Sequence, residues 1–264
     1  MWAWVLVSVM VMQHVSQKHV LLLVKRSEFS LPENTLNLHN ASMTNAPTTS
    51  PTSPCVLLTG FEAFGDDRNA DIPRNSSWLT AQSLHGQLIA DHQLIAAQLP
   101  CVFADAGTEL LRLVREFQPA LVICLGQAND RQVISLERIA ININDARIAD
   151  NAGKQPIDQP VIEGGAVAYF SSLPLKPMLA ALQRVGTASE ISQTAGTFVC
   201  NHVFYSLMHF LDSTATGVGW IRGGFIHLPP LPSDQTPPMS LEEMVVGLRQ
   251  VIACALTTPL FPKK

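Results

Sequence analysis

The sequence predicts an α/β fold: a single domain built on an open twisted sheet, mixed or mostly parallel, with helices on both faces. Three features of the chain indicate this class. Short, strongly apolar runs alternate with longer segments whose apolar residues recur at helical spacing. Gly, Pro and Asn separate these runs. Because parallel strands need a crossover connection, usually a helix, the alternation favours a sheet of mainly parallel strands.

The expected strands share an apolar or alternating pattern and end at a turn residue or a polar loop. They are residues 56–59, 92–99, 120–125, 134–143, 190–192 and 223–228. The expected helices have apolar residues three or four positions apart, and two of them begin at a capping residue. They are the segment from Asn75 to about His85, residues 106–117 before Pro119, residues 176–185, the segment that begins at Cys200, and the segment that Ser240 and Glu243 cap.

Length, composition and charge narrow the function classes. The chain has 264 residues, of which 47% are apolar, enough for one sizeable core. The chain has a formal net charge of −4 and no dense Lys/Arg run. These two features exclude a basic surface of the kind that binds nucleic acid. The sequence holds no Gly-x-Gly-x-x-Gly motif and no phosphate-binding loop, so we expect no nucleotide and no other cofactor. A small, neutral or weakly charged substrate fits this balance.

The N-terminal part of the chain differs from the rest, so we divide the sequence into an extension, residues 1–54, and a catalytic α/β domain, residues 55–264. The apolar run at 5–12 is too short to span a bilayer and lacks the features of a signal peptide. We expect the extension to be disordered or a mis-assigned start, with residues 1–42 upstream of a true start at Met43. The alternative is a weak membrane-associating or export segment.

The five cysteines are widely spaced, with neither a C-x-x-C pair nor a metal-ligand cluster, so we expect no metal site. Four lie in apolar runs typical of buried thiols in a reducing compartment. Cys200 differs because it begins an apolar helical pattern after the small, hydroxyl-rich segment 192–197. A thiol in the first helical turn lies near unpaired N–H groups and the positive end of the helix dipole, which favour the thiolate. Cys200 is therefore the candidate nucleophile.

A thiol nucleophile needs a base, and the base needs an orienting group. His227 is the candidate base, because it ends an apolar strand that Gly223 and Gly224 begin. Glu137 is the candidate orienting group, because apolar residues flank it in a predicted strand. Each has an ordinary alternative: a hydrogen-bonded histidine at a strand end, and a carboxylate paired with Arg138 or Arg147.

Four segments together resemble the pyrrolidone-carboxylate peptidases, also called pyroglutamyl aminopeptidases. They are Thr59–Gly65 (TGFEAFG), Leu136–Ile148 (LERIAININDARI), Thr194–His202 (TAGTFVCNH) and Arg222–His227 (RGGFIH). The similarity covers roughly residues 55–258 in the same order. It implies a cytoplasmic cysteine peptidase with an open α/β fold that removes N-terminal pyroglutamate from peptides. It also implies a homo-oligomer, usually a tetramer, without nucleic-acid partners or stable membrane association.

Matched residue by residue, the resemblance implies that Cys200 is the nucleophile, His227 the base and Glu137 the residue that orients the base. It implies that Arg147 lies near the oxyanion site. The residues that it assigns to the pyroglutamate pocket or to the loops beside it are Phe61, Phe64, Asn75, Gln127, Phe198 and Val199. The pyroglutamyl ring is a flat, uncharged lactam, so aromatic walls and a few amide hydrogen bonds suit it.

The chain departs from the family pattern in the loops rather than at Cys200, His227 or Glu137. Ala63 replaces a usual proline, residues 66–74 separate the first motif from Asn75, and residues 127–131 read Gln-Ala-Asn-Asp-Arg. These changes alter the loop that is expected to close over the pyroglutamyl ring, and hence affect the affinity for the substrate. Two alternatives stay open: a related thiol amidase with another acyl specificity, and a non-catalytic protein that binds pyroglutamate.

Overall fold

A computed structural model describes residues 54–65, 74–214, 221–231 and 239–259, and these contain one large mixed sheet. The strands of the large sheet are β1 (Cys55–Phe61), β2 (Leu88–Ile89), β3 (His92–Leu99), β4 (Leu121–Gln127), β5 (Ile134–Glu137), β8 (Ser189–Ser192) and β9 (Arg222–Leu228). Their order is β2-β3-β1-β4-β9-β5-β8. The pairs β1–β3, β1–β4 and β4–β9 are parallel. The predicted α/β class with a mostly parallel sheet is confirmed.

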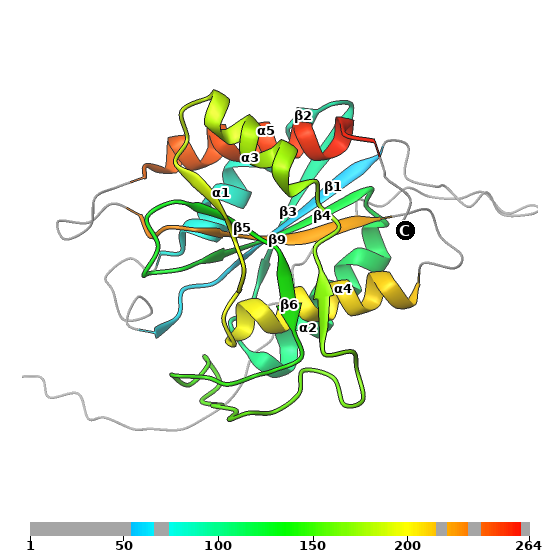
Figure 1. Cartoon of the computed structure of the whole chain (residues 1–264), viewed down its shortest axis with the longest axis vertical. Coiled ribbons are helices and arrows are strands. Elements are labelled where there is room, and N and C mark those ends of the chain that lie inside the picture. The colour runs from blue at the N-terminus through cyan, green and yellow to red at the C-terminus, as the bar shows by residue number, and fades with distance from the viewer. Residues whose placement is uncertain (1–53, 66–73, 215–220, 232–238, 260–264) are drawn as a thin grey trace, which may run out of the picture. The chain divides into compact units, whose positions relative to one another are not determined.

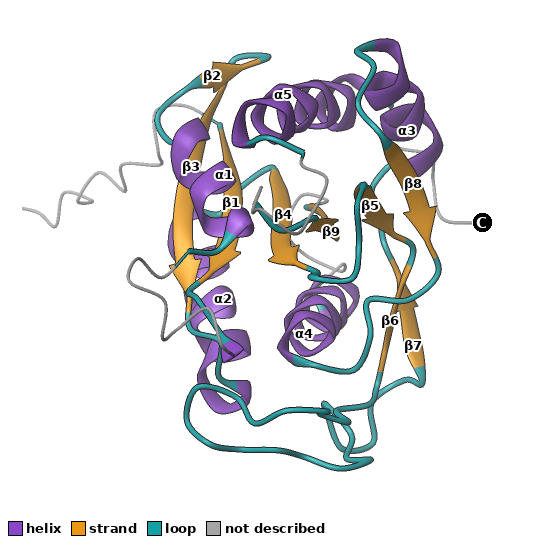
Figure 2. Ribbon diagram, turned by 90° about the vertical axis from the view of Figure 1, so that its left-hand side faces the viewer, coloured by secondary structure: helices purple, strands orange, loops and turns teal. Residues whose placement is uncertain are grey.

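Helices cover both faces of this sheet, as Figures 1 and 2 show. They are α1 (Ser76–Leu84), α2 (Phe103–Phe117), α3 (Leu175–Arg184), α4 (Val199–Ser213) and α5 (Leu241–Thr257). Helices α1, α3 and α5 contribute to one buried apolar cluster, and α2 and α4 contribute to another. Alternate residues of one strand enter the two clusters, Val56 and Leu58 the first and Leu57 the second. A strand buried on both faces must be apolar throughout, which explains the continuous runs in the sequence.

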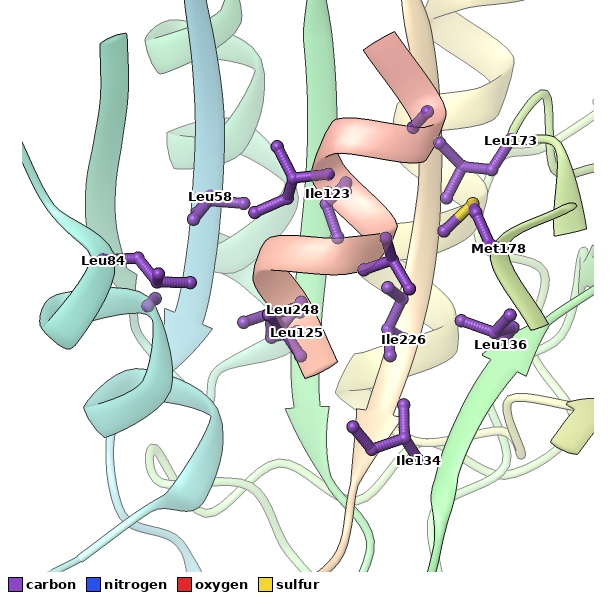
Figure 3. Packing of buried hydrophobic residues seen from close by; sticks show 14 of the residues in the cluster. Leu58, Leu84, Ile123, Leu125, Ile134, Leu136, Leu173, Met178, Ile226 and Leu248 are labelled. Atoms are coloured by element: carbon purple, nitrogen blue, oxygen red, sulfur yellow. The ribbon is translucent and has the colours of Figure 1, made fainter. Parts of the chain in front are cut away.

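The first cluster fixes the helices on the face away from Cys200. Figure 3 shows Leu248 of α5 beside Leu125 of β4, with Ile226 of β9 on the same face of the sheet. All three side chains are fully buried. Burial of each such side chain stabilises the fold by roughly 1.5–3 kcal/mol.

Local sequence signals set several helix ends. The Asn75 side chain accepts a hydrogen bond from the Ser77 N–H and so caps α1. Ser240 and Glu243 form the predicted capping box of α5. Helix α2 begins at Phe103, three residues before the predicted start, and ends at Phe117, as predicted. Its C-cap, Gln118, has a left-handed backbone and precedes Pro119.

The prediction of one strand over residues 134–143 is wrong. The segment divides at Arg138 into β5, in the large sheet, and β6 (Ile139–Ile141), which pairs with β7 (Ala168–Phe170) in a small separate sheet. The short strands β2 and β7 were also missed by the sequence analysis. Strand β5 runs antiparallel to β9 and parallel to β8, which makes the large sheet mixed.

Apart from Pro54, the predicted extension, residues 1–54, lies outside the described residues, as does the loop 66–73. The described residues all belong to one unit of the chain, residues 48–264. None of the helices within the described ranges is long and apolar enough to cross a membrane.

Candidate active site

Strand pairing brings His227 and Glu137 together on the sheet face that α4 covers. Gly126 of β4 pairs with His227 of β9, and Ser135 of β5 pairs with His227 from the other side. Side chains two residues apart on a strand point to the same face, so Glu137 lies on the face of Ser135 and therefore of His227. Cys124 and Phe225, each two residues before Gly126 and His227 on the same strands, pack with α4 in the second apolar cluster.

His227 and Glu137 form a buried hydrogen-bonded pair. The distance from His227 Nδ1 to Glu137 Oε1 is 2.8 Å, and the exposed fractions of the two residues are 4% and 0%. An ionised carboxylate only accepts hydrogen bonds, so in the neutral imidazole Nδ1 carries the proton. The lone pair then lies on Nε2, which can accept a proton.

Arg131 is the arginine that pairs with Glu137, and the expected partners, Arg138 and Arg147, are not. Its NH1 lies 2.6 Å from Glu137 Oε1, and its NH2 donates to the Thr194 carbonyl at 2.8 Å. This pair could not be predicted from the sequence, because Arg131 lies in a polar loop without periodicity. The sequence analysis singled out residues 127–131 only as a departure from the family pattern and assigned no role to Arg131.

Cys200 lies in the first turn of α4, as predicted, and its thiol packs over Gly126. A Cβ atom added at Gly126 would stand 2.8 Å from Cys200 Sγ and 2.8 Å from the Phe225 ring. The thiol therefore occupies space that a side chain at position 126 would fill. The Phe225 ring also stands 4.9 Å, between centroids, from the His227 imidazole, so these groups form one packed cluster.

The expectation that the helix start favours the Cys200 thiolate is not supported by the pKa. Burial is the largest cause that raises the pKa of this thiol well above its ordinary value, and Cys101 and Glu137 add to the rise. The positive charge of Arg131 acts in the opposite direction. Burial therefore favours the protonated thiol over the thiolate, and a base is the group that can convert one into the other.

Hydrogen bonds hold the segment that leads into Cys200. The Thr194 carbonyl accepts from the Ser192 hydroxyl at 2.9 Å as well as from Arg131. Thr197 donates through its hydroxyl to the Asp145 carbonyl at 2.6 Å, and its own carbonyl accepts from the Asp145 N–H. Between them, Gly196 has a φ of +74°, a conformation that favours glycine. The segment is thus fastened at both ends before α4 begins.

Two of the predicted pocket phenylalanines face each other beside this segment. The ring centroids of Phe64 and Phe198 are 6.2 Å apart, and both side chains are partly exposed. Phe61 is buried and packs against Phe225, 6.5 Å between centroids, and Val199 is fully buried. Phe64 and Phe198 are therefore the predicted wall residues that a ligand can reach.

Phe103 is an aromatic neighbour that the sequence analysis did not select. Its ring meets Phe198 edge-on at 5.4 Å between centroids, and meets His202 in the same way at 5.7 Å. Asp150 fixes the start of α2 by accepting from the Phe103 N–H at 2.9 Å. This contact could not be predicted from the sequence, because Phe103 is far from Phe198 along the chain.

The two predicted amide residues, Asn75 and Gln127, have protein partners. Asn75 donates through Nδ2 to the Glu62 carbonyl at 3.0 Å, besides its capping of α1. Gln127 accepts from the Ser76 N–H at 2.7 Å and donates to Asn129 at 2.8 Å. Asn75 thus joins the loop after β1 to the start of α1, and Gln127 joins the end of β4 to the same helix start.

Arg147 is not among the hydrogen-bond or ion-pair partners of His227 and Glu137 in the described part of the chain. Arg147 is exposed. It lies two residues after Asp145, whose carbonyl accepts the hydrogen bond from the Thr197 hydroxyl. Its side chain forms no hydrogen bond or ion pair with another described residue. In the described ranges of the chain, no group of three His, Cys, Asp or Glu residues is placed to hold a metal ion.

A helix-start thiol and a buried imidazole–carboxylate pair on the same face of an α/β sheet are the arrangement of a cysteine hydrolase. The family model for pyroglutamyl peptidase matches residues 55–258. The chain belongs to this family, as the motifs predicted.

Curated relatives and solved structures agree with the match. The pyrrolidone-carboxylate peptidase of Cupriavidus taiwanensis is 49% identical over 210 residues, 78% of this chain and 94% of the relative. That of Pseudomonas fluorescens SBW25 is 50% identical over 214 residues, 79% and 96% of the two chains. The crystal structure of Bacillus amyloliquefaciens pyroglutamyl peptidase I has a TM-score of 0.71 at 37% identity, covering 78% of this chain and 98% of that one. The enzyme of Thermococcus litoralis has a TM-score of 0.71 at 34% identity, covering 77% and 93%.

Proposed function

We propose that the protein is a cysteine peptidase that removes the N-terminal pyroglutamyl residue from peptides. The observation that carries the proposal is the buried His227–Glu137 pair on the sheet face where the Cys200 thiol packs over Gly126. The names of the relatives give the substrate class. Cys200 acts as nucleophile, His227 as base and Glu137 as the group that orients the imidazole.

The first half of the reaction acylates the thiol. Nε2 of His227 takes the proton of Cys200, and the thiolate attacks the carbonyl carbon of the pyroglutamyl residue. The C–N bond of the tetrahedral intermediate then breaks, and His227 returns the proton to the leaving amine. The products of this step are a thioester on Cys200 and a shortened peptide.

The second half releases the acyl group. Water attacks the thioester while His227 accepts one of its protons, and the proton then returns to the thiol as the C–S bond breaks. The step yields free pyroglutamate and the original Cys200 thiol. Because burial raises the pKa of that thiol, the base is needed in each cycle.

The start of α4 is suited to stabilising the oxyanion. The first N–H groups of a helix have no intrahelical acceptor, and those around Cys200 are next to the reacting sulfur. One well-placed donor contributes about 3–4 kcal/mol to transition-state stabilisation. In this proposal Arg147 adds positive charge near the oxyanion. Two hydrogen bonds between Asp145 and Thr197 support this role, because they fasten the segment that contains Arg147 to the segment before Cys200.

The aromatic walls suit an uncharged ring. Phe64 and Phe198 offer apolar faces, with Phe61 and Val199 buried behind them. A lactam has no ammonium group and needs no acidic anchor, unlike the N-terminus of an ordinary peptide. Asn75 and Gln127 act in this proposal by holding the loops around the ring.

The test is the hydrolysis of a pyroglutamyl-7-amido-4-methylcoumarin reporter by thiol-reduced protein. We expect turnover that Cys200→Ser abolishes and iodoacetamide blocks. Cys254→Ser is the matched control, since this partly exposed thiol lies in α5, and it should keep full activity. No turnover by the reduced protein, or turnover that survives Cys200→Ser, would contradict the proposal.

Two further arms of the same assay test the alternatives. Faster cleavage of prolyl or glutaminyl reporters would indicate a different acyl specificity. Thermal stabilisation by free pyroglutamate without any turnover would indicate a binding protein.

We also infer that the chain acts as a homotetramer in the cytoplasm, as the family resemblance implies. The exposed side chains of Ile157, Val167 and Phe170, 73%, 88% and 70% accessible, support association because such residues favour burial. The free thiols of the described cysteines support a reducing compartment. Light scattering on the wild type and Phe170→Glu, and cell fractionation, test the two inferences. A monomeric wild type would contradict the first, and an extracellular protein the second.

A further inference from the structure

Arg131 joins two parts of the site that are far apart in the sequence. It lies in the loop between β4 and β5, and the exposed fraction of its side chain is 19%. One guanidinium nitrogen donates to Glu137 Oε1 at 2.6 Å and the other to the Thr194 carbonyl at 2.8 Å. The planar fork of a guanidinium can make both bonds at once, which an ammonium group does less well.

The orientation of the Glu137 carboxylate depends on Arg131. Its Oε1 accepts from both Arg131 and His227, whereas its Oε2 has no hydrogen-bond partner among the described residues. A fully buried carboxylate that loses a cationic partner is an uncompensated charge. Without Arg131, the Glu137 carboxylate would be held only by its hydrogen bond to His227, although its role is to orient that imidazole.

The second bond fixes the segment before the nucleophile. Thr194 starts the turn that passes through Gly196 and enters α4 at Phe198. Because the Thr194 carbonyl is held by Arg131, the position of the helix start is coupled to that of Glu137. A change of about 1 Å in the geometry of reacting groups can reduce a rate about a hundredfold.

We propose that Arg131 is a positioning residue that keeps the Glu137 carboxylate directed at His227 and the segment before Cys200 in register with that pair. The proposal rests on the proposed function, in which these groups form the catalytic machinery. Arg131 touches none of the reacting atoms and acts through Glu137 and Thr194.

Besides His227, the proposed base from β9, four charged or titratable groups influence the pKa of the Cys200 thiol. They are Glu137 from β5, Arg131 from the β4–β5 loop, Cys124 from β4 and Cys101 from the turn before α2. Of these, Arg131 lowers the pKa of the Cys200 thiol and the others raise it. Loss of Arg131 should therefore make the thiolate harder to form, in addition to the loss of orientation.

The test compares Arg131→Met with Arg131→Lys and with a matched control, Arg138→Met. Arg138 is next to Glu137 in the sequence but forms no ion pair with it. Two quantities are measured on the full chain: kcat and KM for the pyroglutamyl reporter, and the pH dependence of Cys200 alkylation by iodoacetamide, followed by peptide mass. Circular dichroism and thermal melting show whether each variant is folded.

For Arg131→Met we expect kcat to fall about a hundredfold with KM changed less than threefold, and the alkylation profile to move to higher pH. Arg131→Lys keeps the charge but not the fork, so it should restore the alkylation profile and leave kcat at least tenfold low. Arg138→Met should resemble the wild type in both.

The proposal is overturned if Arg131→Met keeps wild-type kcat, or if Arg131→Lys restores both quantities fully, which would make its role one of charge alone. If Arg131→Met does not fold, the kcat of Arg131→Lys decides. Alkylation needs no peptide, so a wild type without turnover whose alkylation profile still depends on Arg131 would contradict the proposed function and not this role.

Discussion

Gly126→Ala tests whether the space above that glycine holds the nucleophile. The added methyl group would stand 2.8 Å from Cys200 Sγ and 2.8 and 2.9 Å from two atoms of the Phe225 ring, closer than such contacts normally allow. The thiol, the ring or the strand must move. Overpacking of this kind costs about 1–3 kcal/mol, against a gain of about 0.4–1 kcal/mol from the lower entropy of the unfolded chain. We expect a net loss of roughly 1–2 kcal/mol and a fall in kcat of about a hundredfold.

The matched control separates stability from catalysis. A methyl group at Gly223, at the other end of the strand that carries His227, would stand 2.6 Å from Leu211 and 3.0 Å from Leu207, both the far ends of side chains on α4. Gly223→Ala should therefore lower the stability by a comparable amount while kcat stays within about threefold. Urea unfolding gives the free energies and the coumarin reporter gives kcat. Wild-type kcat in Gly126→Ala, or an equal loss in both variants, would refute the argument that this glycine makes room for the thiol.

Three further outcomes follow from the site. Glu137→Gln should reduce kcat by about 10²–10⁴-fold with the fold intact, since the amide no longer selects the imidazole tautomer; a kcat within threefold of the wild type would show that orientation is supplied elsewhere. Phe103→Leu removes the edge contact on Phe198, so KM for the reporter should rise several-fold while the rate of Cys200 alkylation stays unchanged, and an unchanged KM would contradict this. Burial lowers the pKa of His202 to about 4, so the unfolded chain binds a proton that the folded chain does not between about pH 6.5 and 4. Stability should fall as pH falls through that window, and urea midpoints of His202→Gln should show a flatter dependence; identical slopes in the two proteins would exclude the contribution of His202.

Local patterns in the sequence were sufficient for the elements that bury apolar surface. Strands β1, β4 and β9 were predicted because strands covered on both faces must be apolar throughout, and the start of α5 because Ser240 and Glu243 cap it within four residues. The position of Cys200 in the first turn of α4 was predicted for the same reason, since helical periodicity begins there. The family motifs then identified the class of enzyme.

Contacts between distant residues were decided by the tertiary structure. Nothing near Glu137 in the sequence selects Arg131 over Arg138 as its ionic partner. The choice depends on how the β4–β5 loop folds back against β5 and on the Thr194 carbonyl, which is 63 residues from Arg131 in the sequence. The division of residues 134–143 at Arg138 likewise depends on the pairing of β6 with β7. The pKa of the Cys200 thiol is the sum of burial, neighbouring thiols and two opposite charges. The sequence determined which residue bears the thiol and that this thiol needs a base. Only the folded chain determined that burial raises the pKa of the thiol and that Arg131 opposes the rise, because both effects depend on contacts between residues far apart in the sequence.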